Sequence, residues 1–131
     1  MIPINIHDSF LPEYKSGNIT YAPIINYEKY SGVSVHIMTN IFDDGPIIAK
    51  KRIKIENKYR DEILYERRKI TPEVISSAIH KINKEERDFK ENLSGSFYNR
   101  CSYETYVKYI CLNFFRKLLS MKPSKYLPVK K

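Results

Sequence analysis

The stretch GVSVHIM at residues 32–38 carries the clearest structural signal in the chain. Its apolar side chains alternate with small or polar ones and include β-branched valines, which is typical of a strand. The turn residues FDDGP follow at 42–46, and the run IIAKKRIKI at 47–55 predicts another strand. The segment therefore predicts two consecutive strands joined by a turn.

The residues that precede this segment predict shorter strands and turns. IPINI at 2–6 has the pattern of a strand end, where Pro3 is tolerated only at an edge or at the start of the strand. LPEYKSGN at 11–18 is rich in turn residues, and a short helix is expected within 19–30. We therefore expect residues 1–55 to form a segment of strands and turns.

The residues that follow predict helices. Thr71 before Pro72 is typical of a helix start, with threonine as the N-cap and proline at the first helical position. A loop is expected over 92–100, and SYET at 102–105 opens a last helix. Apolar residues in that helix recur at helical spacing, so we expect them to pack in the core. They are Tyr106, Val107, Ile110, Cys111, Phe114, Phe115 and Leu118.

Length and composition limit the class of protein. The 131 residues are 42% hydrophobic and 29% charged, which excludes disordered and collagen-like chains and favours one modest domain. No uncharged run approaches the roughly 18–20 apolar residues of a membrane span. The N-terminus has no signal-peptide pattern, and Cys101 and Cys111 match no zinc, redox or disulfide spacing. We expect a cytoplasmic protein without a membrane partner.

The net charge of +8 is unevenly distributed. Residues 1–49 contain two basic and five acidic side chains, whereas 50–131 contain the other 21 basic and 10 acidic ones. A basic half favours anionic partners such as nucleic acid. Acidic residues interrupt it, however, as in DEILYERRKITPE at 61–73, which is typical of a solvated helix. A basic nucleic-acid-binding module is therefore an alternative, but it lacks an aromatic-basic recognition signature.

Three side chains form a plausible chemical group. Asn5 and His7 occupy alternate positions where a strand ends, so both leave the chain on the same side. Asp43 lies in the turn after another strand. An amide and an imidazole can donate hydrogen bonds to a developing oxyanion, and a carboxylate can orient the imidazole or relay a proton. These residues suit acyl transfer to an amine, although stabilising turns is the more common role of such side chains.

The same residues lie within a series of motifs. NIHDSFLP at 5–12 resembles the N-x-H-x-S-L-L-P signature of the folate-dependent formyltransferases, and YKSG at 14–17 resembles its Y-[KR]-x-G continuation. IINYE at 24–28 and GVSVH at 32–36 resemble the family's ING-E and GVT-H stretches. FDDGPII at 42–48 resembles its D-x-G-x-I-I turn. Several motifs in the same order are more specific than any one of them.

This resemblance implies a reaction and a role for each residue. The reaction would transfer a formyl group from 10-formyltetrahydrofolate to a primary amine. Asn5 and His7 would polarise the formyl carbonyl and stabilise the oxyanion. Asp43 would assist proton movement from the acceptor amine and hold His7. The turn that would lie against the pteridine end of the folate consists of Asp43, Asp44, Gly45 and Pro46.

The resemblance also indicates the kind of acceptor. GSFY at 95–98 and SY at 102–103 resemble a tail of sugar-directed members, which favours an amino-sugar nucleotide over glycinamide ribonucleotide. The acceptor would be phosphorylated or nucleotide-linked. No metal is implied, and the sequence has no cluster of ligand-type His and Cys. His36 and His80 are expected to be structural, as a strand residue and a surface helix residue.

In the family these motifs follow a doubly wound set of strands and helices. The chain therefore resembles an α/β protein: the C-terminal half of a Rossmann-like formyltransferase domain, followed by a helical tail. We expect one partial domain over 1–131, with the motifs in 1–55 and helices in 56–131. Unpaired strand edges would favour self-association. Besides an active enzyme, the alternatives are a truncated, catalytically silent fragment and a half that needs a separate N-terminal partner.

Overall fold

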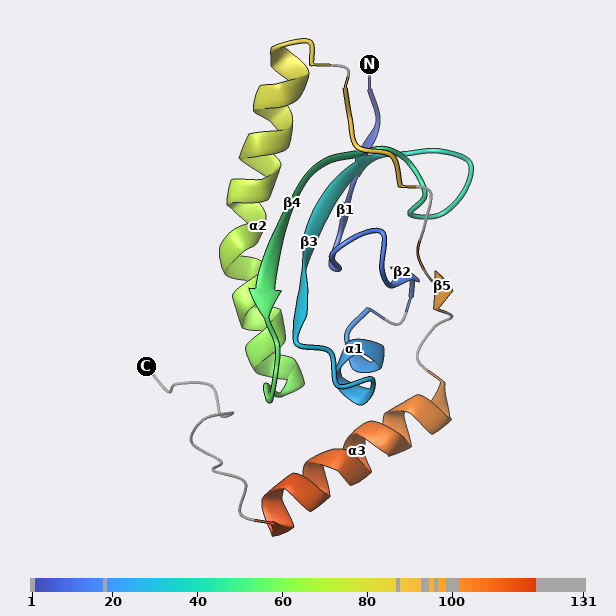
Figure 1. Cartoon of the computed structure of the whole chain (residues 1–131), viewed down its shortest axis with the longest axis vertical. Coiled ribbons are helices and arrows are strands. Elements are labelled where there is room, and N and C mark those ends of the chain that lie inside the picture. The colour runs from blue at the N-terminus through green and yellow to red at the C-terminus, as the bar shows by residue number, and fades with distance from the viewer. Residues whose placement is uncertain are drawn as a thin grey trace.

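A three-stranded antiparallel sheet forms the centre of the protein, which we describe from a computed structural model. A long helix lies along one face of the sheet, and two shorter helices lie near its lower end (Figure 1). In chain order the elements are β1 (Ile4–His7), β2 (Lys15–Ser16), α1 (Tyr21–Ile25), β3 (Tyr30–Ile37), β4 (Ile47–Lys54), α2 (Arg60–Asn83), β5 (Phe97–Tyr98) and α3 (Tyr103–Leu118). The structure describes residues 2–17, 19–86, 88–92, 95, 97–98 and 102–119.

The sheet confirms the three predicted strands, with ends that differ slightly from the prediction. Its order is β1-β3-β4, and β3 is antiparallel to both neighbours. The alternating pattern of β3 places Val33 and Val35, both fully buried, in a core cluster with Val74 and Ala78 of α2. Burying a valine side chain contributes about 1.5–3 kcal/mol, so this face fixes the register of α2 on the sheet.

The other face of β3 is covered by the loop after β1. Gly32 lies there because a Cβ atom would come within 2.2 Å of the Lys51 carbonyl oxygen and 2.9 Å of the Phe10 ring. Ser34 is fully buried and joins the loop to the strand, since it donates to the Ser9 carbonyl over 2.8 Å. The loop therefore lies directly on the sheet and leads into β2.

The predicted helix start at Thr71 is wrong. α2 already begins at Arg60, and its N-terminus is capped where the Tyr59 N–H donates to Glu62 Oε2 over 2.8 Å. Pro72 lies inside the helix and has no N–H for the carbonyl four residues earlier. Because Pro72 is on the exposed side of α2, water can satisfy that carbonyl, and the helix continues.

The predicted core packing of the last helix is also wrong. The apolar side chains singled out in the sequence are largely exposed in α3, for example Phe114 (61%) and Leu118 (65%). Tyr109 and Leu112 instead pack against a buried cluster that includes Ile63. The physical reason is that α3 contacts the rest of the protein mainly through α1, so only a narrow strip of the helix is covered.

The structure also tests the expected short helix, the start of the last helix and the loop before it. The short helix expected within 19–30 is confirmed as α1, and the last helix begins at Tyr103, next to the predicted start. The loop expected over 92–100 contains β5, which pairs in parallel with β2; residues 93, 94, 96, 99 and 100 lie outside the described part. No described helix has the length and apolarity to cross a membrane. The α/β class is confirmed, and the assignment to a C-terminal half stays a prediction.

Candidate functional site

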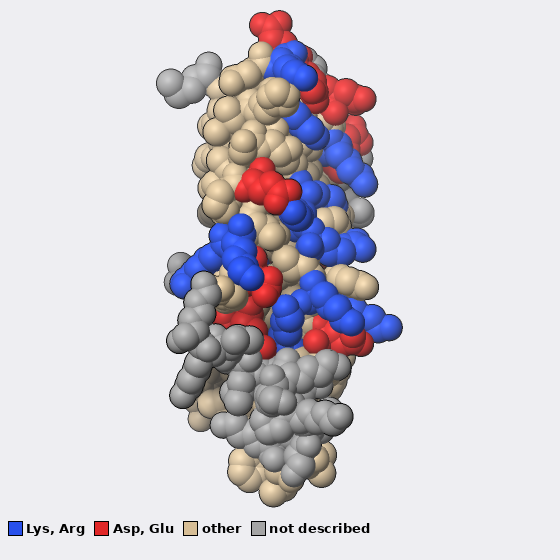
Figure 2. Space-filling model, turned by 90° about the vertical axis from the view of Figure 1, so that its left-hand side faces the viewer, with Lys and Arg blue, Asp and Glu red and all other residues tan. Residues whose placement is uncertain are grey.

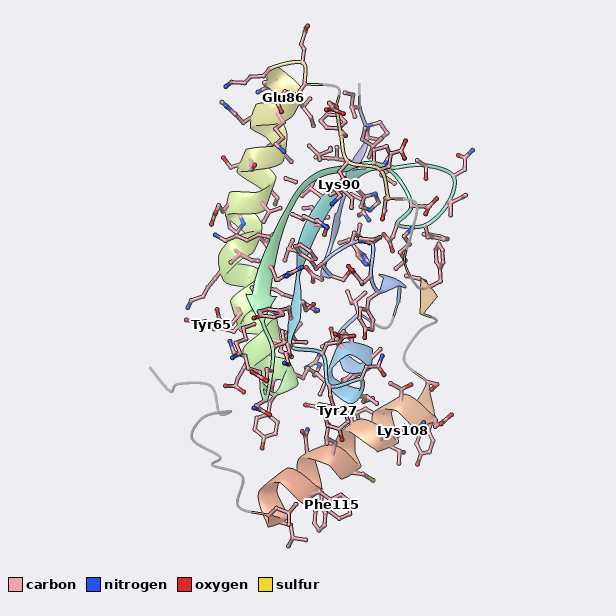
Figure 3. The ribbon with its side chains drawn as sticks, viewed as in Figure 1. Tyr27, Tyr65, Glu86, Lys90, Lys108 and Phe115 are labelled. Atoms are coloured by element: carbon pink, nitrogen blue, oxygen red, sulfur yellow. The ribbon has the colours of Figure 1, made fainter. Side chains whose placement is uncertain are left out.

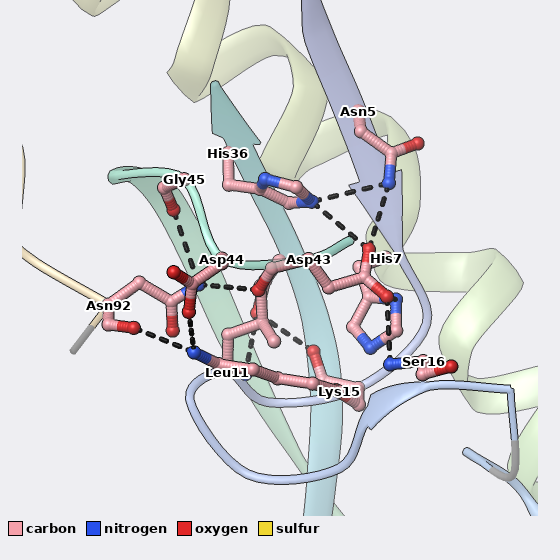
Figure 4. A network of polar contacts seen from close by, with 12 residues as sticks. Asn5, His7, Leu11, Lys15, Ser16, His36, Asp43, Asp44, Gly45 and Asn92 are labelled. Carbon is pink, nitrogen blue, oxygen red and sulfur yellow. Dashed lines mark hydrogen bonds and ion pairs between the residues drawn. The ribbon is translucent and has the colours of Figure 1, made fainter. Parts of the chain in front are cut away.

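The sheet register brings together residues that are far apart in the sequence. Asn5 of β1 lies directly opposite His36 of β3 in the antiparallel pair. The chain then turns between β3 and β4, and this turn carries Asp43 back over the same end of β1 (Figure 4). The three predicted residues Asn5, His7 and Asp43 therefore lie in one polar cluster.

The Asp43 carboxylate is the centre of this cluster. Its Oδ2 accepts a hydrogen bond from the Ser16 N–H over 2.9 Å and lies 3.3 Å from His7 Nδ1. Its Oδ1 accepts from Asn5 Nδ2 over 3.2 Å and lies 3.3 Å from His36 Nε2. The Asp43 side chain is only 10% exposed. One nearly buried carboxylate is thus held between two imidazoles, an amide and a backbone N–H.

His36 is a site residue that the sequence reading missed. It was expected to be only structural, but its Nε2 lies 3.2 Å from Asn5 Nδ2 as well as close to Asp43. Its Nδ1 lies 2.9 Å from the Ile37 carbonyl oxygen, to which it can only donate. The neutral ring therefore presents an acceptor Nε2 to the Asn5 amide. His80, by contrast, is exposed on α2, as predicted.

His7 is buried, with both ring nitrogens occupied. Its Nε2 lies 2.9 Å from the Tyr14 carbonyl oxygen, to which it donates, and its Nδ1 faces Asp43. Burial lowers the pKa of His7, against the opposing effects of the Tyr14 carbonyl and the Asp43 carboxylate. In the neutral ring, Nδ1 is a lone pair facing a carboxylate. Their contact becomes attractive when one more proton is present, whereas burial disfavours the charged ring.

A second set of contacts fixes the turn that contains Asp43. The fully buried Lys15 of β2 pairs with the Asp44 carboxylate and donates to the Asn92 carbonyl over 2.7 Å. The Asn92 side-chain amide donates to the Asp43 carbonyl over 2.7 Å and to the Gly45 carbonyl over 3.2 Å. Neither Lys15 nor Asn92 was identified from the sequence. Together they hold the turn from two distant segments.

The backbone at this site is strained. Tyr14, Ser16 and Asp43 all have positive φ angles, of 57°, 73° and 52°. Residues other than glycine adopt such angles at an energetic cost that the surrounding contacts must offset. Two of these residues are the partners in the Ser16 N–H to Asp43 hydrogen bond. Strained backbone is common at functional sites, where it helps to fix a side chain in place.

The cluster borders a small cavity of about 170 Å³. Asn5, His36 and Asp43 line it together with the loop at 38–42. Drug-sized ligands occupy cavities of about 300–1,000 Å³, so this cavity alone is too small for a ligand of that size. A larger cavity of about 460 Å³ lies at the Tyr30 end of β3, and its lining includes Tyr14, whose carbonyl contacts His7. We place the candidate site at the smaller cavity because the titratable groups converge there.

The predicted folate-contacting turn, residues 43–46, lies beside this cavity. Of its members, Asp43 lines the cavity and Asp44 is occupied by Lys15. Gly45 is buried, and a Cβ atom there would come within 1.8 Å of the Ile37 carbonyl oxygen. Among the described residues, no group of three His, Cys, Asp or Glu side chains is arranged to hold a metal ion.

The basic residues of the second half do not form a continuous charged face on α2. Figure 2 shows the side of the molecule that α2 occupies, where Lys and Arg gather along the right-hand side and Asp and Glu lie near both ends of this row and beside its middle. Ion pairs such as Lys51–Glu73 and Lys58–Glu66 contribute to this mixed surface. The pattern is that of a solvated helix, as the sequence predicted.

Comparisons with known proteins relate the chain to one family. Residues 2–79, more than half of the chain, match the family model described as Formyl transferase. The bifunctional polymyxin resistance protein ArnA of Wigglesworthia glossinidia brevipalpis is 31% identical over 105 residues, which cover 73% of this chain and 15% of ArnA. GDP-perosamine N-formyltransferase of Brucella melitensis is 42% identical over 53 residues, which cover 40% of this chain and 20% of that enzyme.

Solved structures give the same result. The sugar 3N-formyl transferase WlaRD, crystallised with dTDP and 5-N-formyl-THF, superposes with a TM-score of 0.67 at 28% identity. The match covers 75% of this chain and 37% of WlaRD. The chain thus spans much less than two thirds of these relatives. On the matched family model, the chain belongs to the formyl transferase family.

Proposed function

We propose that this chain carries the formyl-transfer site of a cytoplasmic, folate-dependent formyltransferase. The reaction would move a formyl group from 10-formyltetrahydrofolate to a primary amine. The observation that supports this most directly is the convergence of Asn5, His7 and His36 on the Asp43 carboxylate beside a cavity. The donor supplies the formyl group, and WlaRD, a relative, was crystallised with 5-N-formyl-THF.

Each side chain has a role that its contacts support. Asn5 lines the cavity, and one of its two amide N–H groups would leave Asp43 or His36 to donate to the formyl oxygen as negative charge develops there. Asp43 accepts the proton that the acceptor amine loses as its nitrogen bonds to the formyl carbon. His7 then shares that proton through Nδ1, which lies 3.3 Å from Asp43 Oδ2. The proton later passes to the folate nitrogen as its bond to the formyl carbon breaks. The chemistry needs no change in oxidation state.

His36 would act as a positioning residue. Its Nε2 accepts from the Asn5 amide, so it orients the Asn5 N–H groups at the edge of the cavity. The assigned role of His7 in polarising the carbonyl is supported less directly, because both of its ring nitrogens are engaged by Tyr14 and Asp43. We therefore propose that His7 mainly shares the proton with Asp43 and orients the Asp43 carboxylate.

The acceptor we favour is an amino-sugar nucleotide. Two of the relatives are a sugar 3N-formyl transferase crystallised with dTDP and a GDP-perosamine N-formyltransferase. Glycinamide ribonucleotide is the second choice, since a phosphoribosylglycinamide formyltransferase from Bacillus halodurans also superposes, with a TM-score of 0.56. Both are phosphorylated amines, in keeping with the expected chemistry of the acceptor.

A half that requires an N-terminal partner is the alternative with structural support. Among the described residues, β1 pairs with β3 only, so its other edge has no strand beside it. The cavity of about 170 Å³ is also too small for the whole donor. A partner strand added to β1 would extend the sheet next to Asn5 and His7. A chain that never meets such a partner would be catalytically silent.

Formyl-transfer assays with dTDP-linked amino sugars would separate these possibilities. The chain is assayed alone and mixed with a separately produced N-terminal half of WlaRD, with Asp43→Asn as the inactive variant and Asp61→Asn, at an exposed position, as its matched control. Turnover by the chain alone supports an autonomous enzyme, and turnover only in the mixture supports the partner model. A folate analogue at about 100 times its Kd should raise stability by about 2.7 kcal/mol. No turnover in either sample, with no folate-induced shift in Tm, would contradict the proposal.

A further inference from the structure

We propose that α3 is the interface of a homodimer, in which two copies of the chain pair their α3 helices antiparallel. The interface would be an exposed apolar strip along the helix, here called the α3 stripe. This proposal does not depend on the formyl-transfer site. The α3 stripe consists of Tyr103, Tyr106, Val107, Ile110, Phe114 and Leu118.

The α3 stripe is a continuous surface. At 3.6 residues per turn, its six members fall within about a third of the helix circumference. Their exposed fractions range from 37% for Val107 to 83% for Tyr103. The opposite side of the helix, with Tyr109 and Leu112, is the one that packs on the protein. Most of the α3 stripe is therefore exposed, although the Tyr106 ring also meets Tyr21 of α1 edge-on, with the ring centroids 6.1 Å apart. The α3 helix lies at the lower end of the view in Figure 1.

The size of the α3 stripe suits a dimer. Its exposed side chains would remove on the order of 700 Å² per copy from water, which is close to the roughly 800 Å² per partner of a standard interface. Contiguous exposed apolar patches of this size usually mark an interaction site. Half of its members are aromatic, the residue class that dominates interface energetics.

The order of residues makes the α3 stripe complementary to itself. In an antiparallel pair centred between Ile110 and Cys111, Tyr103 of one copy lies level with Leu118 of the other. The same symmetry places Val107 level with Phe114, so a small side chain meets a large one on both sides of the centre. Such an isologous contact closes as a two-fold dimer. The antiparallel arrangement also opposes the two helix dipoles favourably.

The overall charge predicts how salt affects the pairing. Each copy has a formal charge of +8, so two copies repel each other at low ionic strength. Added salt screens this repulsion and strengthens apolar burial, so the dimer becomes tighter. Binding to a polyanion would weaken under the same conditions. Salt dependence thus distinguishes a self-docking surface from a charge-driven one.

Cys111 provides a reporter of the geometry. It is free and exposed, and it flanks the α3 stripe at the centre of symmetry. Packed helix axes lie about 8–10 Å apart, so the two Cys111 residues would come within reach of a short bis-maleimide linker. Replacing Cys101 by serine leaves Cys111 as the one thiol of the chain.

Sedimentation of the full chain over a range of concentrations tests the proposal. We expect a monomer–dimer equilibrium that shifts toward dimer in higher salt. Phe114→Glu should raise the Kd of the dimer about a thousandfold. The substitution places one charge from each copy in the interface, and each charge weakens the affinity at least about thirtyfold. Phe115 (Figure 3) would lie level with Tyr106 of the other copy in this register, so the matched control is Leu119→Glu, at an apolar position that is 67% exposed and lies off the α3 stripe. It should change the equilibrium much less.

Crosslinking provides a readout that does not depend on those variants folding. The Cys101→Ser chain should form a covalent dimer through Cys111 at concentrations where sedimentation shows dimer. A chain with its single cysteine moved to the exposed position 77 of α2 should not. A chain that sediments as a monomer at all concentrations would overturn the proposal. So would a dimer that Phe114→Glu leaves intact, or one in which Cys111 does not crosslink.

Discussion

The buried Lys15–Asp44 pair allows a quantitative test of what holds the turn that contains Asp43. Lys15 is 1% exposed, and Asp44 is its carboxylate partner among the described residues. The ammonium otherwise has the Asn92 carbonyl, 2.7 Å away, and the Phe97 ring, whose centroid is 5.2 Å away. Asp44→Asn preserves the shape of the side chain but removes its charge. The substitution leaves a buried ammonium without a counter-charge.

The free energies follow from this burial. Breaking a buried ion pair costs about 3–5 kcal/mol, but the Asp44 side chain is 31% exposed, so solvent screening reduces our expectation to about 2 kcal/mol. Lys15→Met removes the buried charge and lets water reach Asp44, so it should cost only about 1 kcal/mol for the lost hydrogen bonds. The double variant should resemble Lys15→Met alone, which gives a coupling energy of about 2 kcal/mol.

Urea unfolding followed by circular dichroism measures the free energy of unfolding of the parent chain, the two single variants and the double variant. Asp61→Asn is the control, because Asp61 is 76% exposed and its loss should change stability by less than about 0.5 kcal/mol. Two outcomes would refute the reasoning: an Asp44→Asn variant as stable as the parent chain, or a double variant whose loss equals the sum of the single losses. Either would mean that Lys15 does not need the carboxylate.

Three further perturbations test other parts of the structure. Burial holds the pKa of His7 below its unfolded value of about 6.5, so the unfolded chain binds the proton first as the pH falls. The free energy of unfolding should therefore decrease as the pH drops below about 6.5. Thermal melts across about pH 5–7.5 should show a weaker decrease for His7→Gln than for the parent chain. Arg67 is 2% exposed, burial lowers its pKa to about 10, and it donates to a backbone carbonyl and two hydroxyls. Arg67→Ala should therefore cost about 3 kcal/mol in urea unfolding, and a loss below about 1 kcal/mol would contradict this packing. Gly45→Ala would bring a Cβ atom within 1.8 Å of the Ile37 carbonyl, so it should lower Tm by several degrees, and an unchanged Tm would show that the turn is free to move.

The part of the site that lies within local motifs could be predicted from the sequence. Asn5 and His7 share one side of a strand, and Asp43 follows another strand, so their proximity was expected and is present. His36 was missed because its role depends on being opposite Asn5, and the pairing register of two distant strands is not visible in either one. A usable signal did exist. The small or polar residues of β3 alternate with valines, which places His36 on the face that the loop after β1 covers.

The errors in the helices have a common physical origin. Thr71 and Pro72 have the local chemistry of a helix start, but the upstream turn has its own cap at Tyr59, so the helix begins there. In α3 the apolar spacing predicts an amphipathic helix correctly, yet it does not reveal which surface will cover the apolar side. Local propensity depends on a few neighbouring residues. The contacts of Lys15 and Asn92 and the exposure of α3 depend instead on segments that are far apart in the chain.

The position of β1 in the sheet links assembly to chemistry. Its backbone pairs with β3 on one side, while its side chains Asn5 and His7 project toward Asp43. Any strand that binds the open edge would therefore fix β1, which carries Asn5 and His7 of the proposed site. Binding of the added strand and activation of the site would then depend in the same way on the concentration of that strand. Such a strand could be added as a separate polypeptide at increasing concentration, and the catalytic rate would then measure the fraction of the chain that has bound it.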